Sequence, residues 1–334
     1  ATVNLSGGTN GGAVALSASA AATVSLTSTG APLTSTGLTG TNTVASLNIG
    51  GTTTSTLNIV ADSNLSTGTG AVTLAARTLN ISGSATSVVL DSDSSVSASN
   101  LTTIDASGMT VGGVTLGLVD GVTSFKGGQG ADTVTTAAIA TGSVIDAGAG
   151  SDLLIIGTAG HLDTAAEGAR YQNFETVRAA SGSYDASLVS SATAIQMTGA
   201  GTLSNLNATQ AGNVQIRADG AYTMSLINGA GTSDVLSMRL GQGTTTTPAT
   251  NLTTGLTANS FETINLATNH GSTAATGGAR TSTVAAFTAD SVTAINLTGS
   301  AFTITNPATT RAVTIDASAL VGDGATTPLG LTVN

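Results

Sequence analysis

Two glycine-rich turns, each closed by one aspartate, are the residues of this chain whose types and spacing best fit metal binding. The first turn is Gly127-Gly128-Gln129-Gly130-Ala131-Asp132, and the second is Ala147-Gly148-Ala149-Gly150-Ser151-Asp152. Glycine lets the backbone adopt positive φ and turn its carbonyl groups inward. The two aspartates lie twenty residues apart, so stacked turns would bring both carboxylates and several carbonyl oxygens together. Calcium takes six to eight such oxygen ligands in a forgiving geometry.

The predicted calcium ligands belong to these turns and to one looser turn of the same kind. A short strand is expected after each aspartate, with alternate side chains buried against neighbouring coils. Chance is the alternative explanation, because 43 of the 334 residues are glycine. The aspartate and the following apolar position, repeated in register, favour calcium. The predicted ligands are Gly127, Gly128, Gly130, Asp132, Asp146, Gly148, Gly150 and Asp152, with Asp234 after the looser turn Asn228-Gly229-Ala230-Gly231-Thr232-Ser233.

Other carboxylates are weaker candidates for functional residues. Asp91 and Asp93 stand at positions i and i+2, which places both on one face of a strand. Their serine-rich flanks favour a solvated turn, while calcium binding and the carboxylate pair of a glycoside hydrolase are the alternatives. We predict that Glu175 and Glu262 face solvent, with a calcium role as the alternative.

The composition predicts an all-β structure. Aromatic residues make up 2% and charged residues 8% of the 334 residues, whereas hydrophobic residues reach 40%. Intrinsic disorder combines low hydrophobicity with high charge, so this composition disfavours it. Threonine, serine, valine and glycine are typical of many short strands with small side chains. We therefore predict an elongated parallel β-solenoid, of β-helix or β-roll type, with irregular loops.

The charge of the chain excludes several partners. A net charge of −10 argues against nucleic acid, whose binders are usually basic, and against anionic lipid headgroups. The absence of cysteine removes disulfides and cysteine metal sites, and no apolar run is long enough to insert into a membrane. The first twelve residues lack a signal-peptide pattern, and the last four read as an interrupted strand. We expect a fragment of a longer protein.

The first part of the chain is nearly repetitive. Ser46-Leu47-Asn48-Ile49, Thr56-Leu57-Asn58-Ile59 and Thr78-Leu79-Asn80-Ile81 each alternate apolar and polar residues, the period of a half-buried strand. The central asparagine is interpreted as a solvent-facing residue rather than part of a buried ladder. We divide the chain into a repetitive solenoid segment (1–126), the calcium-binding turns (127–157) and a duplicated β-unit that continues the solenoid (158–334).

The duplication in the third segment is inferred from two pairs of similar sequence segments. Phe174-Glu175-Thr176 resembles Phe261-Glu262-Thr263, and the stretch around Ile195 resembles the stretch around Ile295. Stacked repeats of this kind bury a continuous core. We predict that both phenylalanines and both isoleucines are buried, and that residues 269–280 form an inserted loop. Asp105 and Asp316, in two Thr-Ile-Asp-Ala-Ser corners, are predicted to accept hydrogen bonds from nearby backbone amides.

The sequence offers no recognisable catalytic motif. His161 and His270 are the two histidines and lie far apart, and neither belongs to an HExxH motif of a zinc enzyme. A GxSxG nucleophile elbow and a phosphate-binding P-loop are also missing. We therefore predict a protein that is not an enzyme.

The glycine-aspartate turns resemble the nonapeptide repeat of RTX parallel β-rolls, glycine-glycine-x-glycine-x-aspartate-x-apolar-x. The turn that begins at Gly127 fits every defined position, and the second turn has Ala147 in place of the first glycine. With the Phe-Glu-Thr and Thr-Ile-Asp-Ala-Ser segments, most of the chain looks like the alphaproteobacterial RTX surface-layer proteins.

This resemblance implies a function and a location. Members of the family leave the cell by type I secretion, fold outside as calcium-loaded β-solenoids and tile into a lattice on the bacterial cell surface. The implied partners are further copies of the chain and a cell-surface glycan. One alternative is the stalk of a large type I secreted RTX adhesin. The other is an extracellular β-helix polysaccharide hydrolase or lyase, which would use Asp91 and Asp93.

Overall fold

The computed structural model of the chain is a parallel β-solenoid, as the composition predicts, and each strand pairing between described residues is parallel. The backbone is described for the first five strands. Backbone and side chains are described for residues 25, 26, 56–67, 72–90, 98, 100–242, 252, 255–268, 281–305, 307–309, 311–320 and 330–334. The loop predicted at 269–280, His270, and the Asp91 and Asp93 pair lie outside the described residues.

The chain divides into two compact units. The first contains residues 1–175 and 189–191, and the second contains residues 176–188 and 192–334. This division differs from the predicted boundaries at 126 and 157. The stretch 127–157 belongs to the first unit, because its strands extend the sheets that earlier coils begin.

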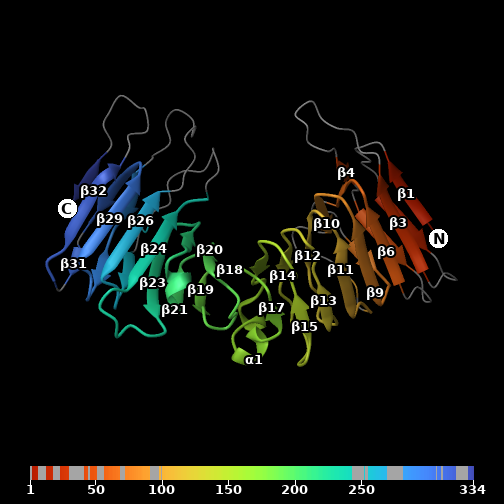
Figure 1. Cartoon of the computed structure of the whole chain (residues 1–334), viewed down its shortest axis with the longest axis horizontal. Helices are drawn as coiled ribbons and strands as arrows, with labels where there is room; N and C mark the ends of the chain where they lie inside the picture. Colours follow the sequence, from red (N-terminus) through yellow and green to blue (C-terminus); the bar gives the residue numbers. More distant parts are fainter. Residues whose placement is uncertain are drawn as a thin grey trace. The chain divides into compact units, whose positions relative to one another are not determined.

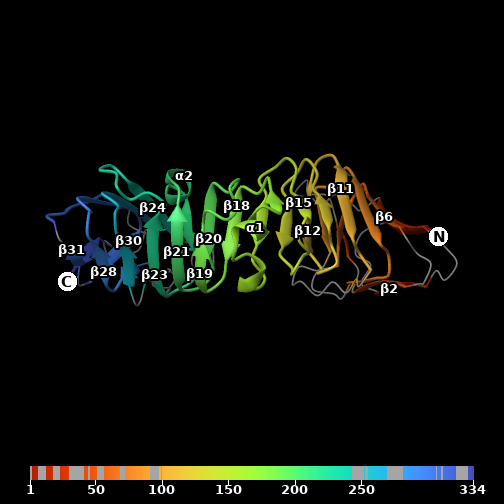
Figure 2. The ribbon, with the colours of Figure 1, turned by 90° about the horizontal axis from the view of Figure 1, so that it is seen from below.

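In the first unit, successive strands wind through stacked sheets, and the strands of a sheet lie side by side (Figures 1 and 2). Strands β4 to β9 pass in turn through three sheets, whereas β11 to β17 alternate between two. The sheets are β1-β3-β6-β9-β11-β13-β15-β17, β4-β7-β10-β12-β14-β16 and β2-β5-β8. The bounds are β1 Thr2–Ser6, β2 Ala13–Ser17, β3 Thr23–Thr29, β4 Thr41–Thr43, β5 Ser46–Gly50, β6 Thr56–Ala61, β7 Asn64–Ser66, β8 Val72–Leu74, β9 Thr78–Gly83, β10 Ser87–Leu90, β11 Thr103–Met109, β12 Gly113–Gly117, β13 Ser124–Lys126, β14 Thr133–Thr135, β15 Val144–Asp146, β16 Leu153–Ile155 and β17 Tyr171–Gln172.

The second unit has the reverse order of coil types. Strands β18 to β25 alternate between two sheets, and β26 to β33 pass through three. The sheets are β18-β20-β22-β24-β26-β29-β32, β19-β21-β23-β25-β28-β31 and β27-β30-β33. The bounds are β18 Thr176–Ala179, β19 Gly182–Asp185, β20 Ala194–Met197, β21 Gly201–Leu206, β22 Val214–Ile216, β23 Ala221–Leu226, β24 Val235–Leu240, β25 Gly255–Ala258, β26 Thr263–Thr268, β27 Thr281–Val284, β28 Phe287–Ala289, β29 Ala294–Gly299, β30 Ala301–Ile304, β31 Pro307–Thr309, β32 Thr314–Leu320 and β33 Leu331–Val333.

Helices are short and lie at turns of the solenoid. The first unit has η1 (Ala159–His161) and α1 (Ala165–Gly168), and the second has α2 (Ala208–Ala211). Asn207 and Gln210 form a capping box at the start of α2, which satisfies two backbone amides that a helix leaves free. The buried Gln210 also donates through Nε2 to two backbone carbonyls of the preceding coil, so α2 is tied to the coil beneath it.

The core is a column of apolar side chains. Strand β6 alternates half-buried and buried residues, with Leu57 and Ile59 inside. In the pairing of β6 with β9, Leu57 stands opposite Leu79, so like side chains stack from coil to coil. This alternation confirms the period-2 pattern read from the sequence.

The asparagines between these apolar residues were predicted to face solvent, and the structure shows that they are half-buried and joined in a ladder. Asn58 and Asn80 are half-buried, and the Nδ2 of Asn80 donates to the Oδ1 of Asn58 over 2.9 Å. In the second unit, Asn296 donates to Asn265 over 2.8 Å. Because parallel pairing in register superposes identical residues, each amide finds the next one along the solenoid.

The two Phe-Glu-Thr segments occupy equivalent positions in the structure. Phe174 and Phe261 are both fully buried, each just before a strand of the same kind of sheet. The third residue after each phenylalanine pairs with the predicted isoleucine of the next coil, in the pairs Val177 with Ile195 and Ile264 with Ile295. Both isoleucines are buried, which confirms the prediction that they occupy matching inward positions.

The Thr-Ile-Asp-Ala-Ser corners are irregularities within strands. The Oδ1 of Asp105 accepts from the backbone N–H of Ser107 over 2.9 Å, and Asp316 accepts in the same way from Ser318. The register of strand pairing shifts beside both aspartates. The predicted capping of local amides is confirmed, and its effect is a bulge that bends the strand.

We expect Phe174→Ala and Phe261→Ala each to lower the free energy of unfolding by about 3–5 kcal/mol, because each removes a fully buried aromatic ring. Urea denaturation followed by circular dichroism measures this loss. The matched controls are Val111→Ala in the first unit and Ile227→Ala in the second, whose side chains are 57% and 62% exposed. Losses below about 1 kcal/mol for both phenylalanines would contradict their role in the core.

Candidate cation sites

The two glycine-aspartate turns stack directly on each other in the first unit. The first connects β13 to β14 and the second connects β15 to β16, and these strands pair in register. The backbone N–H of Gly127 donates to the carbonyl oxygen of Asp146 over 2.8 Å, and that of Ala149 donates to Gly128 over 3.0 Å. The stacking predicted from the spacing of twenty residues is present.

Glycine is required in these turns by close approach and by backbone conformation. A Cβ on Gly127 would overlap the carbonyl oxygen of Ala147 in the next coil. Gly148 has a φ of +87°, which residues with a Cβ rarely adopt. A Cβ on Gly150 would lie 2.5 Å from the carbonyl oxygen of Gly130 and 2.9 Å from the Oδ1 of Asp152. The missing Cβ therefore leaves a space bordered by oxygen atoms.

Three carboxylates form a column along the edge where these turns stack. The Oδ1 of Asp132 accepts from the backbone N–H of Val114 over 2.6 Å. The Oδ1 of Asp152 accepts from the N–H of Asp132 over 2.7 Å, and the Oε2 of Glu175 accepts from the N–H of Asp152 over 2.8 Å. Each member of this carboxylate column, Asp132, Asp152 and Glu175, thus binds a backbone amide of the coil before it.

Asp152 is the member of the column whose hydrogen bonding is incomplete. Its side chain is fully buried, and its Oδ2 has no hydrogen-bond partner among the described residues. Burial raises the pKa of Asp152 to about 7, and the neighbouring charges of Asp132, Glu175 and Asp146 add to this increase. A buried carboxylate among like charges requires either a proton or a cation.

Asp132 differs from Asp152 because both of its oxygens are occupied. Its Oδ2 accepts from the N–H of Gly128 over 3.0 Å, in addition to the bond from Val114. Burial raises its pKa. Asp132 therefore stabilises the backbone of its own turn and of the preceding coil.

Asp146 lies on the outer face of the sheet, beside a basic residue. It pairs in register with Lys126 on β13, which in turn pairs with Asp105 on β11. Its Oδ1 accepts from the backbone N–H of Gly148 over 3.0 Å and from the Nδ2 of Asn173 over 2.7 Å. Hydrogen bonds from Gly148 and Asn173 therefore hold the Asp146 carboxylate in place. The buried Oδ2 of Asp152 has no such bond among the described residues.

The second unit repeats the arrangement at Asp234. The Oε2 of Glu262 accepts from the backbone N–H of Asp234 over 2.8 Å, as Glu175 does for Asp152. The Oδ2 of Asp234 is buried and has no hydrogen-bond partner in the part of the chain that the structure describes, and a Cβ on Gly231 would lie 2.5 Å from that oxygen. The looser turn is therefore a second copy of the Asp-Glu pair.

The glutamates of these pairs, which were predicted to face solvent, are only partly exposed. Glu175 and Glu262 are half-buried, and each carboxylate accepts a backbone amide from an aspartate of the preceding coil. The sequence carried a usable signal, since each Phe-Glu-Thr segment follows a glycine-aspartate turn by one coil. To use that signal, however, one must know the number of residues in each coil, and this number differs between the two copies.

The Asp152 site fits a hard divalent cation by its donor set. It offers the free Oδ2, the Glu175 carboxylate beside it and the carbonyl oxygen of Gly130, all of which are oxygen donors that calcium prefers. Among the described residues, no group of three or more His, Cys, Asp and Glu side chains is arranged to hold a metal ion. An ion at this site would therefore need main-chain carbonyls as well as carboxylates.

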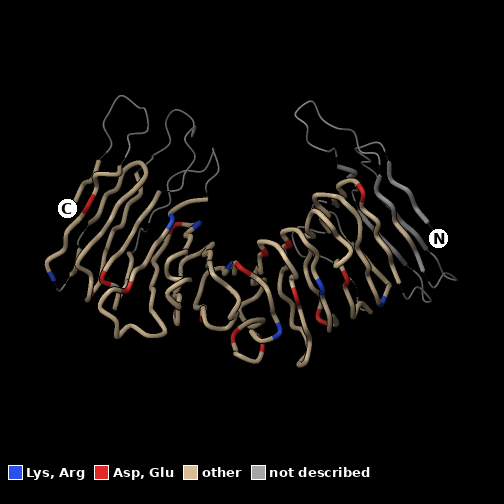
Figure 3. The backbone as a smooth tube through the Cα atoms, in the orientation of Figure 1, with Lys and Arg blue, Asp and Glu red and all other residues tan. Residues whose placement is uncertain are grey.

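Charge elsewhere in the chain is sparse, and the charged residues are scattered along both units (Figure 3). His161 is half-buried, with its Nδ1 3.1 Å from the carbonyl oxygen of Thr136 and 3.3 Å from its hydroxyl. These contacts anchor the short helix η1 to the preceding coil. No helix among the described residues has the length and apolar character needed to cross a bilayer.

Comparison with known proteins assigns the chain to no family. No protein-family model, no curated protein and no solved structure matches it. The class that the structure defines is a parallel β-solenoid with two Asp-Glu pairs at stacked glycine turns.

We expect the stability of the chain in a chelator to depend on pH through Asp152. Its folded-state pKa of about 7 exceeds the ordinary value of 3.8, so the folded state holds the proton more tightly than the unfolded state does. The free energy of unfolding should therefore decrease as pH rises from about 4 to about 7, by at most about 4 kcal/mol. Asp152→Asn should remove this part of the decrease.

The measurement is urea denaturation of both proteins across this pH range. Asp120→Asn is the matched control, since Asp120 is exposed and accepts only the Ala138 N–H from the next coil. Parallel pH profiles for the wild type and Asp152→Asn would show that the buried carboxylate does not titrate in this range.

Proposed function

We propose that the chain is a structural, non-catalytic segment of a bacterial surface layer, self-assembling and stabilised by calcium outside the cell. The observation that carries this proposal is the buried Asp152, whose Oδ2 lacks a partner and whose neighbours in the carboxylate column are also acidic. A divalent cation would neutralise this cluster and join two successive coils. Lattice formation, secretion by the type I route and location on the cell surface rest on the sequence resemblance.

The fold supports an architectural role in a second way. A solenoid presents long faces on which the same residue types recur from coil to coil, such as the asparagine ladder at Asn58 and Asn80. Small and uncharged side chains let two such faces approach closely. Calcium could also bridge acidic edges of neighbouring copies, which would repel each other without it.

The first test concerns calcium and stability. At a calcium concentration about 100 times the dissociation constant, binding to the folded chain should add about 2.7 kcal/mol to its free energy of unfolding. Asp152→Asn should lose most of this gain, whereas Asp120→Asn should keep it. Asp132→Ala should lose stability both with calcium and in chelator, because two buried backbone amides lose their acceptor.

Thermal and urea denaturation, each with calcium and with chelator, measure these effects, and calcium titration by calorimetry gives the number of ions. An equal gain from calcium in the wild type and in Asp152→Asn would remove this aspartate from the site. Asp234→Asn tests the second Asp-Glu pair in the same way.

The second test concerns assembly. Light scattering of the wild type should rise with millimolar calcium and return to its starting value in chelator, because the ion offsets repulsion between acidic copies. Electron microscopy then separates a two-dimensional sheet, which a surface layer requires, from isolated rods, which a stalk would give. A strict monomer over the whole calcium range contradicts self-assembly of this segment.

A further inference from the structure

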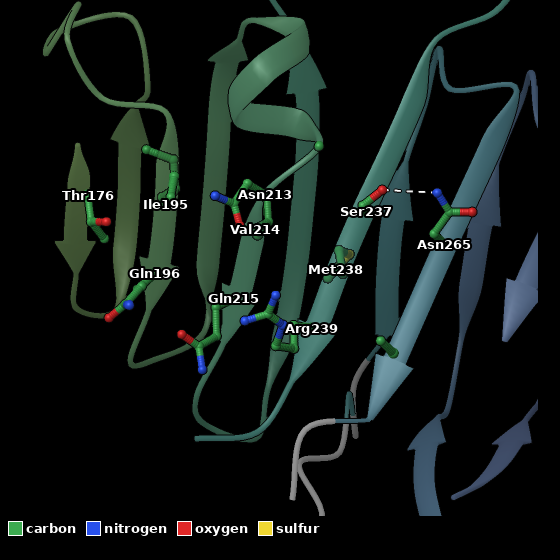
Figure 4. Close-up of a pocket in the computed structure, with 13 residues that line it drawn as sticks. Thr176, Ile195, Gln196, Asn213, Val214, Gln215, Ser237, Met238, Arg239 and Asn265 are labelled. Carbon is green, nitrogen blue, oxygen red and sulfur yellow. Dashed lines mark hydrogen bonds between the residues drawn. The ribbon is translucent and has the colours of Figure 1, made fainter. Parts of the chain in front are cut away.

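An open groove of about 280 Å³ crosses the outer face of the sheet that contains β18, β20, β22, β24 and β26 in the second unit. Its lining includes the small residues Ala194, Gly212 and Ala267. Gln196, Gln215 and Arg239 border it with longer polar side chains (Figure 4). This groove lies apart from the Asp-Glu pairs, and the calcium proposal does not use it.

Three long polar residues of the groove, Gln196, Gln215 and Arg239, stand in one row across the strands, and Arg178 extends this row beyond the lining. Arg178 pairs in register with Gln196, Gln196 with Gln215, and Gln215 with Arg239. Adjacent strands are about 4.8 Å apart, so the row extends over about 14 Å. The spacing between successive side chains of this arginine-glutamine row is therefore about the length of one sugar ring.

The two glutamines in the row present opposite hydrogen-bonding groups. The Oε1 of Gln196 accepts from the Nε of Arg178 over 2.8 Å and from an Nη of Arg217 over 2.9 Å, which leaves its Nε2 to donate. The Nε2 of Gln215 donates to the carbonyl oxygen of Gly241 over 2.8 Å, which leaves its Oε1 to accept. Hydroxyl groups of a ligand both donate and accept, so they match this pair.

The groove is also a concentration of positive charge in an acidic chain. Arg239 lines the groove, and Arg178 and Arg217 both donate to Gln196 of its lining. These are three of the eight basic residues in a protein of net charge −10, and the lining contains no Asp or Glu. Arg239 is exposed and has no hydrogen-bond partner among the described residues, and the Nε of Arg217 is buried and unpaired. The lining of the groove therefore offers these guanidinium groups no carboxylate.

We propose that this groove binds an acidic polysaccharide, with a uronate carboxylate on Arg239 and ring hydroxyls on Gln196 and Gln215. A guanidinium can donate two parallel hydrogen bonds to a carboxylate. The small residues Ala194, Gly212 and Ala267 in the lining leave room for a sugar ring. An acidic peptide would also satisfy the arginines, but an extended peptide rises only about 3.3 Å per residue whereas the row repeats at about 4.8 Å, so the row favours a glycan.

The experiment is calorimetric titration of the full chain with hexagalacturonate at low ionic strength, with its fully methyl-esterified form and hexaglutamate as comparison ligands. Hexagalacturonate should bind at least about tenfold more tightly than either, because only it combines carboxylates with ring hydroxyls. Repeating the titration in chelator with Asp152→Asn should give the same affinity, which keeps this inference separate from the calcium proposal.

Two variants assign the binding to the groove. Arg239→Gln should weaken hexagalacturonate binding at least about tenfold, and Gln215→Leu should weaken it while leaving any binding of hexaglutamate unchanged. Arg311→Gln is the matched control, because Arg311 is an exposed arginine of the same unit outside the groove. Circular dichroism checks that each variant is folded.

Three results would overturn the inference. The first is the absence of hexagalacturonate binding at low-millimolar concentration. The second is equal binding of the methyl ester or of hexaglutamate, which would indicate a neutral-sugar site or a site for an acidic protein segment. The third is an equal effect of Arg239→Gln and Arg311→Gln, which would indicate non-specific attraction.

Discussion

The stacking of one coil on the next in parallel register is the constraint on which the rest of this structure depends. Neighbouring strands are about 4.8 Å apart, and each backbone amide of a coil must find its partner in the next. Turns must then pass over one another without side chains between them, which is why Gly127 approaches the carbonyl oxygen of Ala147 so closely. The same constraint superposes like residues, and it creates both the apolar column inside and the polar rows outside.

Stacking in register brings acidic residues of successive coils close together, so their carboxylates repel each other. The chain offsets this repulsion in different ways. On the outer face, Lys126 lies between Asp105 and Asp146. In the carboxylate column, backbone amides supply the partners, and for Asp132 they occupy both oxygens. At Asp152 the amides occupy only one oxygen, and the burial of the other raises the pKa of this residue. Because of this imbalance, we expect the stability of the fold to depend on the protonation of Asp152.

The second unit shows that the same geometry can concentrate either sign of charge. Asp234 and Glu262 repeat the acidic pair at a turn, while Arg178, Arg217 and Arg239 gather on the face of a sheet. Turns bring backbone oxygens and carboxylates together, which suits a cation. Sheet faces present long side chains at the strand spacing, which suits a repeating polymer. A solenoid can therefore carry a structural ion site and a glycan-binding surface without interference between them.

The sequence by itself determined the fold class and the position of the acidic turns. Alternation of apolar residues, as at Leu57 and Ile59, indicates strands, and the spacing of twenty residues between Asp132 and Asp152 indicates stacked coils, because both features are local and periodic. The burial of Phe174 and Phe261 followed from the same kind of pattern. These predictions succeeded because the physical cause, a repeat of fixed length, is visible along the chain.

Only the tertiary structure decided which side chain meets which. Coil length varies, with 23 residues between Asp152 and Glu175 and 28 between Asp234 and Glu262, so the sequence could not show that each glutamate binds the amide of an aspartate. The asparagine ladder and the arginine-glutamine row were likewise hidden, since Gln196, Gln215 and Arg239 become neighbours only through strand register. Hydrogen bonds and burial across coils depend on that register, and register is set by the packing of the whole stack rather than by any one repeat.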